Sequence, residues 1–191
     1  MMPISIDIPK LNTPRDVGGK LLRIGRIEQI MSEWCFAACG EMISKYFDLS
    51  ATQCLIANSY LKGFGSCTDA CHDPSRCNSP CQIQKISSVY KAFDILSTYM
   101  PRPADSNWIA QEIVGAQRPV MALLTFAAGG GHVLLITGWQ PNGPHGPMVY
   151  AIDTRINYGE GWYDYSAILQ AQNGQGAWVG SWVGISRSNS A

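Results

Sequence analysis

Gln29-Ile-Met-Ser-Glu-Trp-Cys-Phe-Ala-Ala-Cys-Gly-Glu-Met-Ile-Ser-Lys-Tyr-Phe47 is the stretch around which the chain is organised. In its second half, apolar residues recur at spacings of three and four, which is the period of one helix face: Phe36, Cys39, Ile43 and Phe47. The sequence therefore predicts a helix that begins at or near Cys35. At a helix N-terminus, the partial positive charge of the backbone N–H groups favours a thiolate over a thiol. Cys35 is therefore a candidate nucleophile.

The sequence motif around Cys35 resembles that of a known family. Gln29 stands six residues before Cys35, and the segment from Trp34 to Met42 reads Trp-Cys-Phe-Ala-Ala-Cys-Gly-Glu-Met. This pattern resembles the bacterial papain-like cysteine peptidases, in the branch that includes plant-pathogen effector proteases and bacteriocin-processing-like (double-glycine-type) peptidases. The resemblance spans roughly residues 27–170 and continues through Thr52–Asn58, Cys77-Asn78, Gly131-His132-Val133 and Ile152-Asp153. It implies a cysteine endopeptidase whose oxyanion hole combines the Gln29 side chain with the backbone N–H of Cys35.

A cysteine peptidase also needs a histidine that pairs with the thiolate and later protonates the leaving amine. The chain has three histidines. His72 lies inside a cysteine-rich stretch, and His145 lies in a proline-rich loop. His132 opens an apolar strand directly after three glycines, where an ionisable side chain is costly unless it has a role. His132 is therefore the candidate base.

Asp153 is the candidate for the group that fixes the imidazole tautomer. A hairpin that returns through Asn142 brings the end of the segment 148–153 alongside the start of 132–139. His132 and Asp153 lie at comparable distances from that loop. Asn157 is the alternative if the loop is longer. Many papain relatives use Asn at this position, whereas the bacterial branch uses Asp.

The chain contains seven cysteines. Without Cys35, an even number remains that could form three disulfides: Cys39, Cys54, Cys67, Cys71, Cys77 and Cys81. The last four of these form a compact cluster with three-residue gaps. Paired disulfides, a four-cysteine zinc site with His72 as a substitute ligand, and reduced thiols are all compatible with that spacing. The resemblance implies disulfide-like cysteines here. In each case we expect a structural role, and we expect neither a catalytic metal nor a cofactor.

The predicted helices and strands are segregated along the chain. Helices are predicted in the first half, at residues 35–47, 51–61, 82–93 and 105–115. Strands follow at residues 119–126, 132–139, 148–153, 161–165 and 177–186, with a short helix at 166–170. This order predicts an α+β fold. The resemblance implies a papain-like division into a helical lobe (27–115), which carries the nucleophile helix, and an antiparallel sheet lobe (116–191). Residues 1–26 are predicted to form an extended N-terminal arm beside this single domain.

The length and net charge of the chain restrict the classes of partner that it can bind. The 191 residues suit one domain, and the net charge of zero offers no strong attraction to nucleic acids or anionic membranes. We expect a monomer whose partner is a protein or peptide substrate. The N-terminus has no secretory signal pattern, and no apolar run is long enough to span a membrane. The cysteine content nevertheless favours an oxidising destination. We therefore expect secretion, or delivery to a target cell as an effector or toxin, without a signal peptide. A cytoplasmic location is the alternative.

Two other functions remain open. An amidase, deamidase or acyltransferase on the same fold would use the same thioester with another substrate or acceptor. A papain-like binding or toxin-delivery module would keep the scaffold without turnover. The sequence does not name the substrate, because the loops that line the pocket set that choice.

Overall fold

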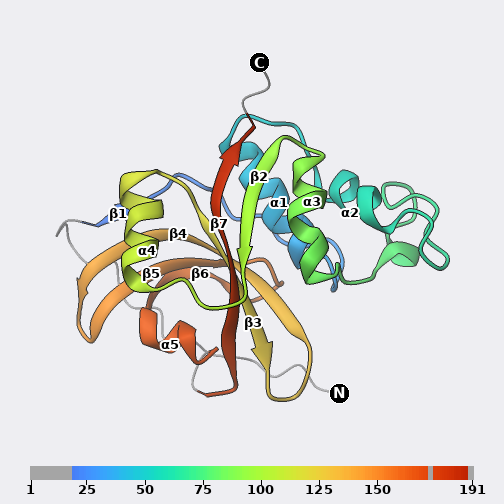
Figure 1. Ribbon diagram of the computed structural model, residues 1–191. Coiled ribbons are helices and arrows are strands. Elements are labelled where there is room, and N and C mark those ends of the chain that lie inside the picture. Colours follow the sequence, from blue (N-terminus) through green and yellow to red (C-terminus); the bar gives the residue numbers. More distant parts are fainter. Residues whose placement is uncertain (1–18, 172–173, 189–191) are drawn as a thin grey trace.

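The computed structural model describes residues 19–171 and 174–188. After the short strand β1 (Lys20–Leu21), three helices follow along the chain: α1 (Cys35–Tyr46), α2 (Gln53–Leu61) and α3 (Ile86–Lys91). They lie together at one end of the molecule, with α2 and the loop that follows it outermost (Figure 1). The other strands follow, so the predicted α+β class is confirmed.

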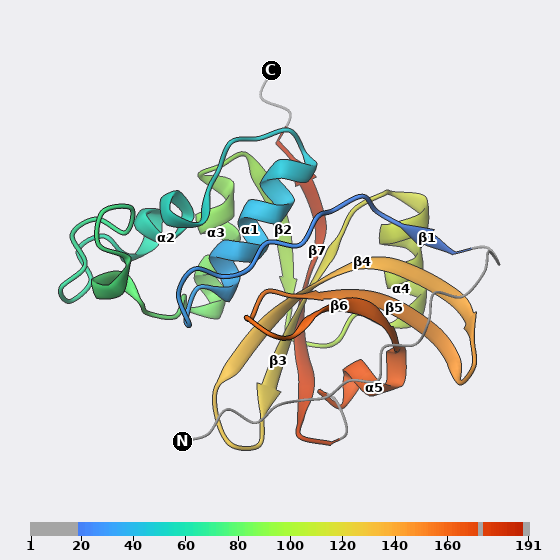
Figure 2. The same cartoon turned by 180° about the vertical axis from the view of Figure 1, so that it is seen from behind.

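A seven-stranded antiparallel sheet forms the other part of the molecule. Its strands are β1 (Lys20–Leu21), β2 (Ile95–Met100), β3 (Val120–Phe126), β4 (Gly131–Gly143), β5 (Gly146–Asp153), β6 (Gly159–Asp164) and β7 (Gly176–Arg187). The order is β2-β7-β3-β4-β5-β6, and β1 pairs with β4. Because β7 lies between β2 and β3, the sheet is complete only when the last strand is in place. The short helices α4 (Ser106–Ala110) and α5 (Tyr165–Leu169) lie at the end of the sheet away from α2 (Figures 1 and 2).

Helix α1 joins the two parts. A Cβ atom on Gly40 would lie 2.8 Å from Ile56 Cδ1 and 2.8 Å from Tyr90 Cε1, so this glycine permits close packing of α1 on α2 and α3. The Tyr90 hydroxyl also donates to the carbonyl of Phe36 at 2.6 Å. On another face, Cys39 Sγ donates to the carbonyl of Val133 in β4 at 3.8 Å. The nucleophile helix is therefore held by helices and by the sheet.

The start of α2 differs from the prediction. Ser50 and Gln53 have the spacing of a capping box, but the helix begins at Gln53, two residues later than expected, and no side-chain cap forms. The Gln53 side chain instead binds the chain before α1: Nε2 donates to the carbonyl of Glu28 at 2.8 Å, and Oε1 accepts from the N–H of Ile30 at 2.9 Å. The backbone N–H of Gln53 donates to Glu41 Oε2 at 3.1 Å. A tertiary contact has therefore replaced the local cap.

Three other regions differ from the prediction. Strand β2 was not predicted, and it forms by pairing with β7. The predicted helix 82–93 consists of a short 3₁₀ turn, η2 (Ile83–Lys85), followed by α3. The predicted helix 105–115 consists of α4, whose cap Asp105 accepts from the N–H of Trp108 at 2.9 Å, followed by the π-helical turn η3 (Gln111–Gly115). Of the predicted N-terminal arm, residues 1–18 lie outside the described residues.

Two disulfides hold the loop that follows α2: Cys54–Cys71 and Cys67–Cys77. This loop also contains the 3₁₀ turn η1 (Pro74–Cys77). Of the six cysteines that could pair, four form these two bridges, and Cys39 and Cys81 are free. Cys39 packs against β4 from α1, whereas Cys81 lies in the segment that leads to α3, so these two belong to different parts of the fold. The disulfides also use three of the four cysteines of the zinc alternative, so that site is not formed.

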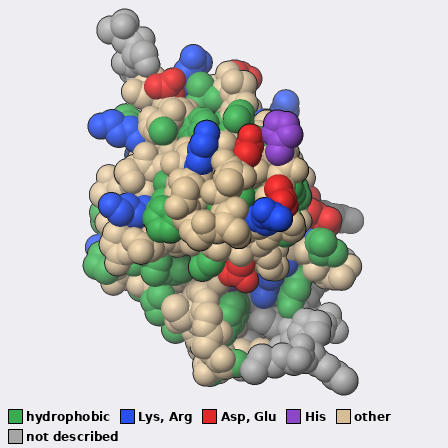
Figure 3. Space-filling view, turned by 90° about the vertical axis from the view of Figure 1, so that its right-hand side faces the viewer, with side chains coloured by type: hydrophobic (Ala, Val, Ile, Leu, Met, Phe, Trp, Pro, Cys, Tyr) green, Lys and Arg blue, Asp and Glu red, His purple; other side chains and the backbone are tan. Residues whose placement is uncertain are grey.

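The surface of this end of the molecule carries charges of both signs. In the view of Figure 3, acidic and basic side chains are interspersed. Several form local pairs, such as Arg76 with Asp73 at 3.1 Å. Within the described part of the chain, no helix is long and apolar enough to cross a membrane.

The disulfide pattern gives a prediction for mass spectrometry. Without reducing agent, the protein should be about 4 Da lighter than the fully reduced chain, because two bridges form. Alkylation of the denatured, unreduced protein should modify Cys35, Cys39 and Cys81. A third bridge, or stoichiometric zinc in the purified protein, would contradict this pattern.

Candidate active site

Cys35 is the first residue of α1, with Trp34 at the N-cap position. The first backbone N–H groups of a helix have no acceptor within the helix, so they are available to a group bound in front of it. Cys35 lines a cleft of about 210 Å³ between the helices and the sheet. The cleft is also lined by Ser32, Glu33, Phe36, Pro80, Cys81, Ile83, Ile86, Leu123, Gly131, His132 and Val133.

His132 and Asp153 come from neighbouring strands. His132 is the second residue of β4, and Asp153 is the last residue of β5. Since Leu135 pairs with Ile152, Asp153 lies diagonally across from His132, a spacing that long side chains can bridge. His132 Nε2 and Asp153 Oδ1 are 2.9 Å apart, and both side chains are buried. The carboxylate beside the imidazole is therefore that of Asp153, whereas Asn157 lies in the following turn.

The electrostatics of this pair favour the charged forms. Burial alone would lower the pKa of His132, but the hydrogen bonds and charges of Asp153 and Cys35 outweigh it and raise the pKa to about 9. Burial alone would likewise raise the pKa of Asp153, yet His132 and Arg155 hold it well below its usual range. Because Nε2 is bound to Asp153, Nδ1 is the ring nitrogen left for Cys35. The geometry therefore suits a thiolate–imidazolium pair.

Gln29 is buried beside this site, and its amide is fully engaged. Nε2 donates to the carbonyls of Met31 at 3.0 Å and Ser32 at 2.6 Å. Oε1 accepts from the hydroxyl of Thr154 at 2.9 Å, and the backbone N–H of Gln29 donates to the carbonyl of Thr154 at 2.8 Å. Gln29 therefore ties the turn before Cys35 to the residue after Asp153. Donation to an oxyanion would require one of the two Nε2 bonds to be exchanged.

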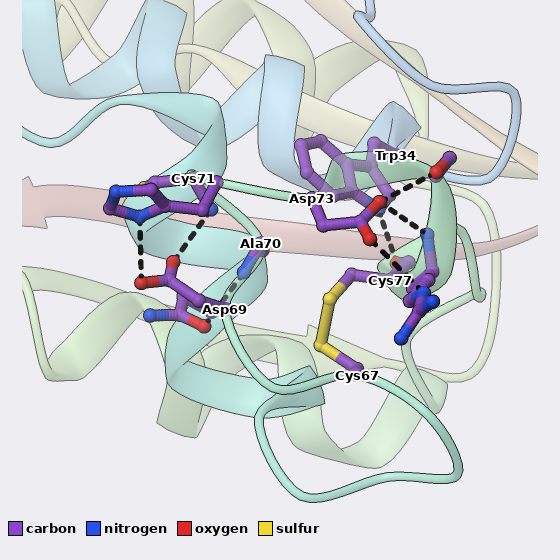
Figure 4. Close-up of a disulfide and its surroundings, with 11 residues drawn as sticks. Trp34, Cys67, Asp69, Ala70, Cys71, Asp73 and Cys77 are labelled. Atoms are coloured by element: carbon purple, nitrogen blue, oxygen red, sulfur yellow. Dashed lines mark hydrogen bonds and ion pairs between the residues drawn. A yellow bond between two sulfur atoms is a disulfide. The ribbon is translucent and has the colours of Figure 1, made fainter.

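The disulfide loop supports the same turn from the other side. Trp34 Nε1 donates to the carbonyl of Cys77 at 2.9 Å, next to the Cys67–Cys77 bridge (Figure 4). The neighbouring Asn78 accepts from the N–H of Glu33 at 3.0 Å through Oδ1 and donates from Nδ2 to Ser32 Oγ at 2.9 Å. The cross-linked loop therefore fixes the segment that positions the nucleophile.

Two arginines near Asp153 were not identified from the sequence. Arg155 NH2 lies 2.7 Å from Asp153 Oδ2, and Arg155 Nε lies 3.1 Å from Oδ1. Arg26 Nε donates to the backbone carbonyl of Asp153 at 2.9 Å. A carboxylate expected at the end of a buried strand needs a charged or hydrogen-bonding partner. Arg155, two positions after Asp153, was the signal in the sequence from which this partner could have been predicted.

The arrangement provides the parts of nucleophilic acyl transfer: a thiol, an imidazole that can hold a proton beside it, and a carboxylate that orients the ring. The first backbone N–H groups of α1 have no acceptor within the helix, so they are available to a carbonyl oxygen that becomes negative. Within residues 19–171 and 174–188, no group of three or more His, Cys, Asp or Glu side chains is placed to hold a metal ion.

Comparison with known proteins agrees with this geometry. Residues 24–157 match the family model described as "Papain-like cysteine protease AvrRpt2". No curated protein sequence matches the chain. Among solved structures, the chain is similar to a double glycine motif protease from an AMS/PCAT transporter, solved with its leader peptide. That match has a TM-score of 0.54 and 10% identity over 88% of this chain and 95% of the other. A second match is UfSP from C. elegans, with a TM-score of 0.48 and 11% identity over 91% of this chain and 35% of the other.

The family match covers well over half of the chain and includes all four predicted site residues: Gln29, Cys35, His132 and Asp153. The double-glycine protease shares the fold, which confirms the papain-like architecture. The chain therefore belongs to the AvrRpt2 family of papain-like cysteine proteases and is a hydrolase.

Proposed function

We propose that the protein is an endopeptidase that cleaves peptide bonds through a thioester on Cys35. The observation that carries this proposal is the meeting of Cys35 at the start of α1 with the buried His132–Asp153 pair in one cleft. All of these groups come from one chain, so the proposed site needs no second subunit.

In the proposed reaction, the Cys35 thiolate attacks the peptide carbonyl carbon and forms a C–S bond. The negative charge on the carbonyl oxygen is met by the backbone N–H of Cys35 and, after exchange of one of its bonds, by Gln29. The imidazolium of His132 then gives its proton to the leaving amine, and the thioester remains. Water next attacks the thioester and gives a proton to His132, which releases the carboxylic acid and restores the pair.

A second hollow supports a polypeptide rather than a small amide as the substrate. It has a volume of about 260 Å³, is lined by residues 29–32, 155 and 156, and adjoins the cleft at Ser32, which lines both. Ile30 and Ile156 flank it with exposed fractions of 61% and 59%. A substrate that fills both hollows extends beyond the residues that flank the cleaved bond. Exposed apolar side chains at this position suit contact with its apolar residues.

The two disulfides support the proposal that the protein acts outside the reducing cytosol. Two bridges hold the loop that fixes Trp34, so their reduction would loosen the nucleophile segment. Disulfides of this structural kind persist in oxidising compartments. We therefore propose that the protease is exported, as an effector or a toxin acting on a target protein.

Substitution of Cys35 by alanine tests the proposed activity. With a peptide library as substrate, Cys35→Ala should abolish cleavage, because no thioester can form. Cys81→Ala is the matched control: Cys81 is a free thiol that lines the same cleft, and cleavage should persist without it because the thioester forms on Cys35. Cleavage that persists in Cys35→Ala would contradict the proposal. A one-dalton change at side-chain amides, without new peptide ends, would indicate a deamidase.

The pH profile tests the role of the His132–Asp153 pair. The imidazolium loses its proton as the pH rises through about 9, so wild-type activity should fall above that value. Asp153→Asn removes the negative charge that stabilises the imidazolium, so this limb should move to lower pH by roughly one unit while some activity remains. Asp105→Asn, which removes the charge at the cap of α4, should leave the limb in place. An unshifted limb in a folded Asp153→Asn variant would contradict the assignment.

Gln29→Ala separates stabilisation of the oxyanion from support of the turn. If Gln29 donates to the oxyanion, kcat should fall by about 100- to 1000-fold with little change in KM, because the hydrogen bond strengthens only as charge develops. If Gln29 only holds the carbonyls of Met31 and Ser32, the melting temperature should fall and kcat per folded molecule should stay constant. Turnover and melting temperature measured on the same preparation decide between the two roles.

A further inference from the structure

The carboxylate of Asp153 is shared between an imidazole and a guanidinium. Its Oδ1 lies 2.9 Å from His132 Nε2, 2.9 Å from the backbone N of Arg155 and 3.1 Å from Arg155 Nε. Its Oδ2 lies 2.7 Å from Arg155 NH2 and 3.2 Å from Arg155 Nε. The guanidinium therefore holds both oxygens, and the imidazole binds one of them.

We propose that Arg155 is a positioning residue of this active site, which fixes the plane of the Asp153 carboxylate and takes up part of its charge. His132 then meets an oriented carboxylate whose attraction for the imidazolium proton is moderated. This inference deepens the proposed peptidase function and rests on it.

Arg155 is itself held in place, as a positioning role requires. Its backbone carbonyl accepts from Arg26 NH2 at 2.8 Å, while Arg26 Nε binds the carbonyl of Asp153. The guanidinium carbon lies 3.7 Å from the centre of the Tyr158 ring, within the range of a cation–π contact. The planar fork of arginine matches a carboxylate with two bonds, which a lysine ammonium cannot reproduce.

The charged and titratable groups around the His132–Asp153 pair come from several elements. Cys35 and Cys39 face it from α1, Tyr163 from β6, Arg26 from the segment before α1 and Arg155 from the loop after β5. Arg26 binds backbone carbonyls in this network, and its charge is balanced by Glu28 at 2.7 Å. Arg155 is therefore the cation of this group whose side chain touches the carboxylate.

A cation on the far side of the carboxylate has a defined effect on the base. The positive charges of His132 and Arg155 share one negative partner and repel each other across it. Loss of the Arg155 charge would leave the carboxylate attracting the imidazolium alone, so the pKa of His132 would rise. A general acid that holds its proton too tightly delivers it more slowly to a leaving amine.

The test is an NMR titration of the His132 imidazole in a Cys35→Ala background, which needs no turnover and so does not depend on the proposed activity. Arg155→Gln should move the midpoint of the His132 titration up by about one pH unit. Arg155→Lys keeps the positive charge, so its midpoint should lie close to that of the parent Cys35→Ala protein. Arg118→Gln is the matched control. Arg118 forms a similar two-bond pair with buried Glu112, at 2.7 and 3.1 Å, so its loss should lower the melting temperature and leave the His132 midpoint unchanged.

An unchanged or lowered midpoint in folded Arg155→Gln would overturn the proposal and leave Arg155 as a structural brace. If Arg155→Gln does not fold, Arg155→Lys decides in the Cys35-containing enzyme. Because lysine keeps the charge but loses the fork, kcat should fall about tenfold while the alkaline limb of the pH profile stays unchanged. A wild-type kcat per folded molecule in Arg155→Lys would also overturn the proposal.

Discussion

The buried hydrogen bond between His132 Nε2 and Asp153 Oδ1 is the contact on which the rest of the site depends. It requires two charged groups in a place where burial disfavours charge, so each stabilises the other and neighbouring groups complete the balance. The bond also fixes which ring nitrogen is left for the nucleophile. Gln29 binds Thr154 through its backbone and its side chain, so the turn before Cys35 is anchored directly beside Asp153. The segment before α1 and the sheet therefore meet through hydrogen bonds at Thr154, directly beside the Asp153 carboxylate.

The disulfide loop stabilises the other end of the same segment. A loop with little apolar core cannot hold a fixed shape unaided, and a cross-link reduces the freedom of its unfolded state. Here the Cys67–Cys77 bridge adjoins the carbonyl that accepts from the Trp34 indole, and Asn78 binds Ser32 and Glu33 just before Cys35. The position of the nucleophile thus depends on covalent cross-links that are distant in sequence. This dependence connects the redox state of the protein with the geometry of its active site.

The sequence predicted what local pattern and chemistry restrict. Helix α1 followed from its apolar period, and the small number of histidines left His132 as the candidate that opens a strand. Contacts between distant segments were not predictable. The Gln53 side chain binds Glu28 and Ile30 instead of capping its own helix, and the pairing of the cysteines depends on how the loop folds back on itself. Arg155 stands two residues from Asp153, yet its role follows only from the turn that brings its guanidinium back to the carboxylate.

The three free cysteines show how position, rather than residue type, selects a nucleophile. Burial, together with the negative charges of Cys35 and Asp153, raises the pKa of Cys39 well above its usual value. Burial and the charge of Cys35 raise the pKa of Cys81 to about 12, although this thiol lines the same cleft. Among the residues that the structure describes, no positive charge lowers the pKa of either thiol, whereas Cys35 is paired with His132 and begins a helix. A thiolate at Cys35 also disfavours a second thiolate nearby, so the protein concentrates the reactivity of several thiols in one.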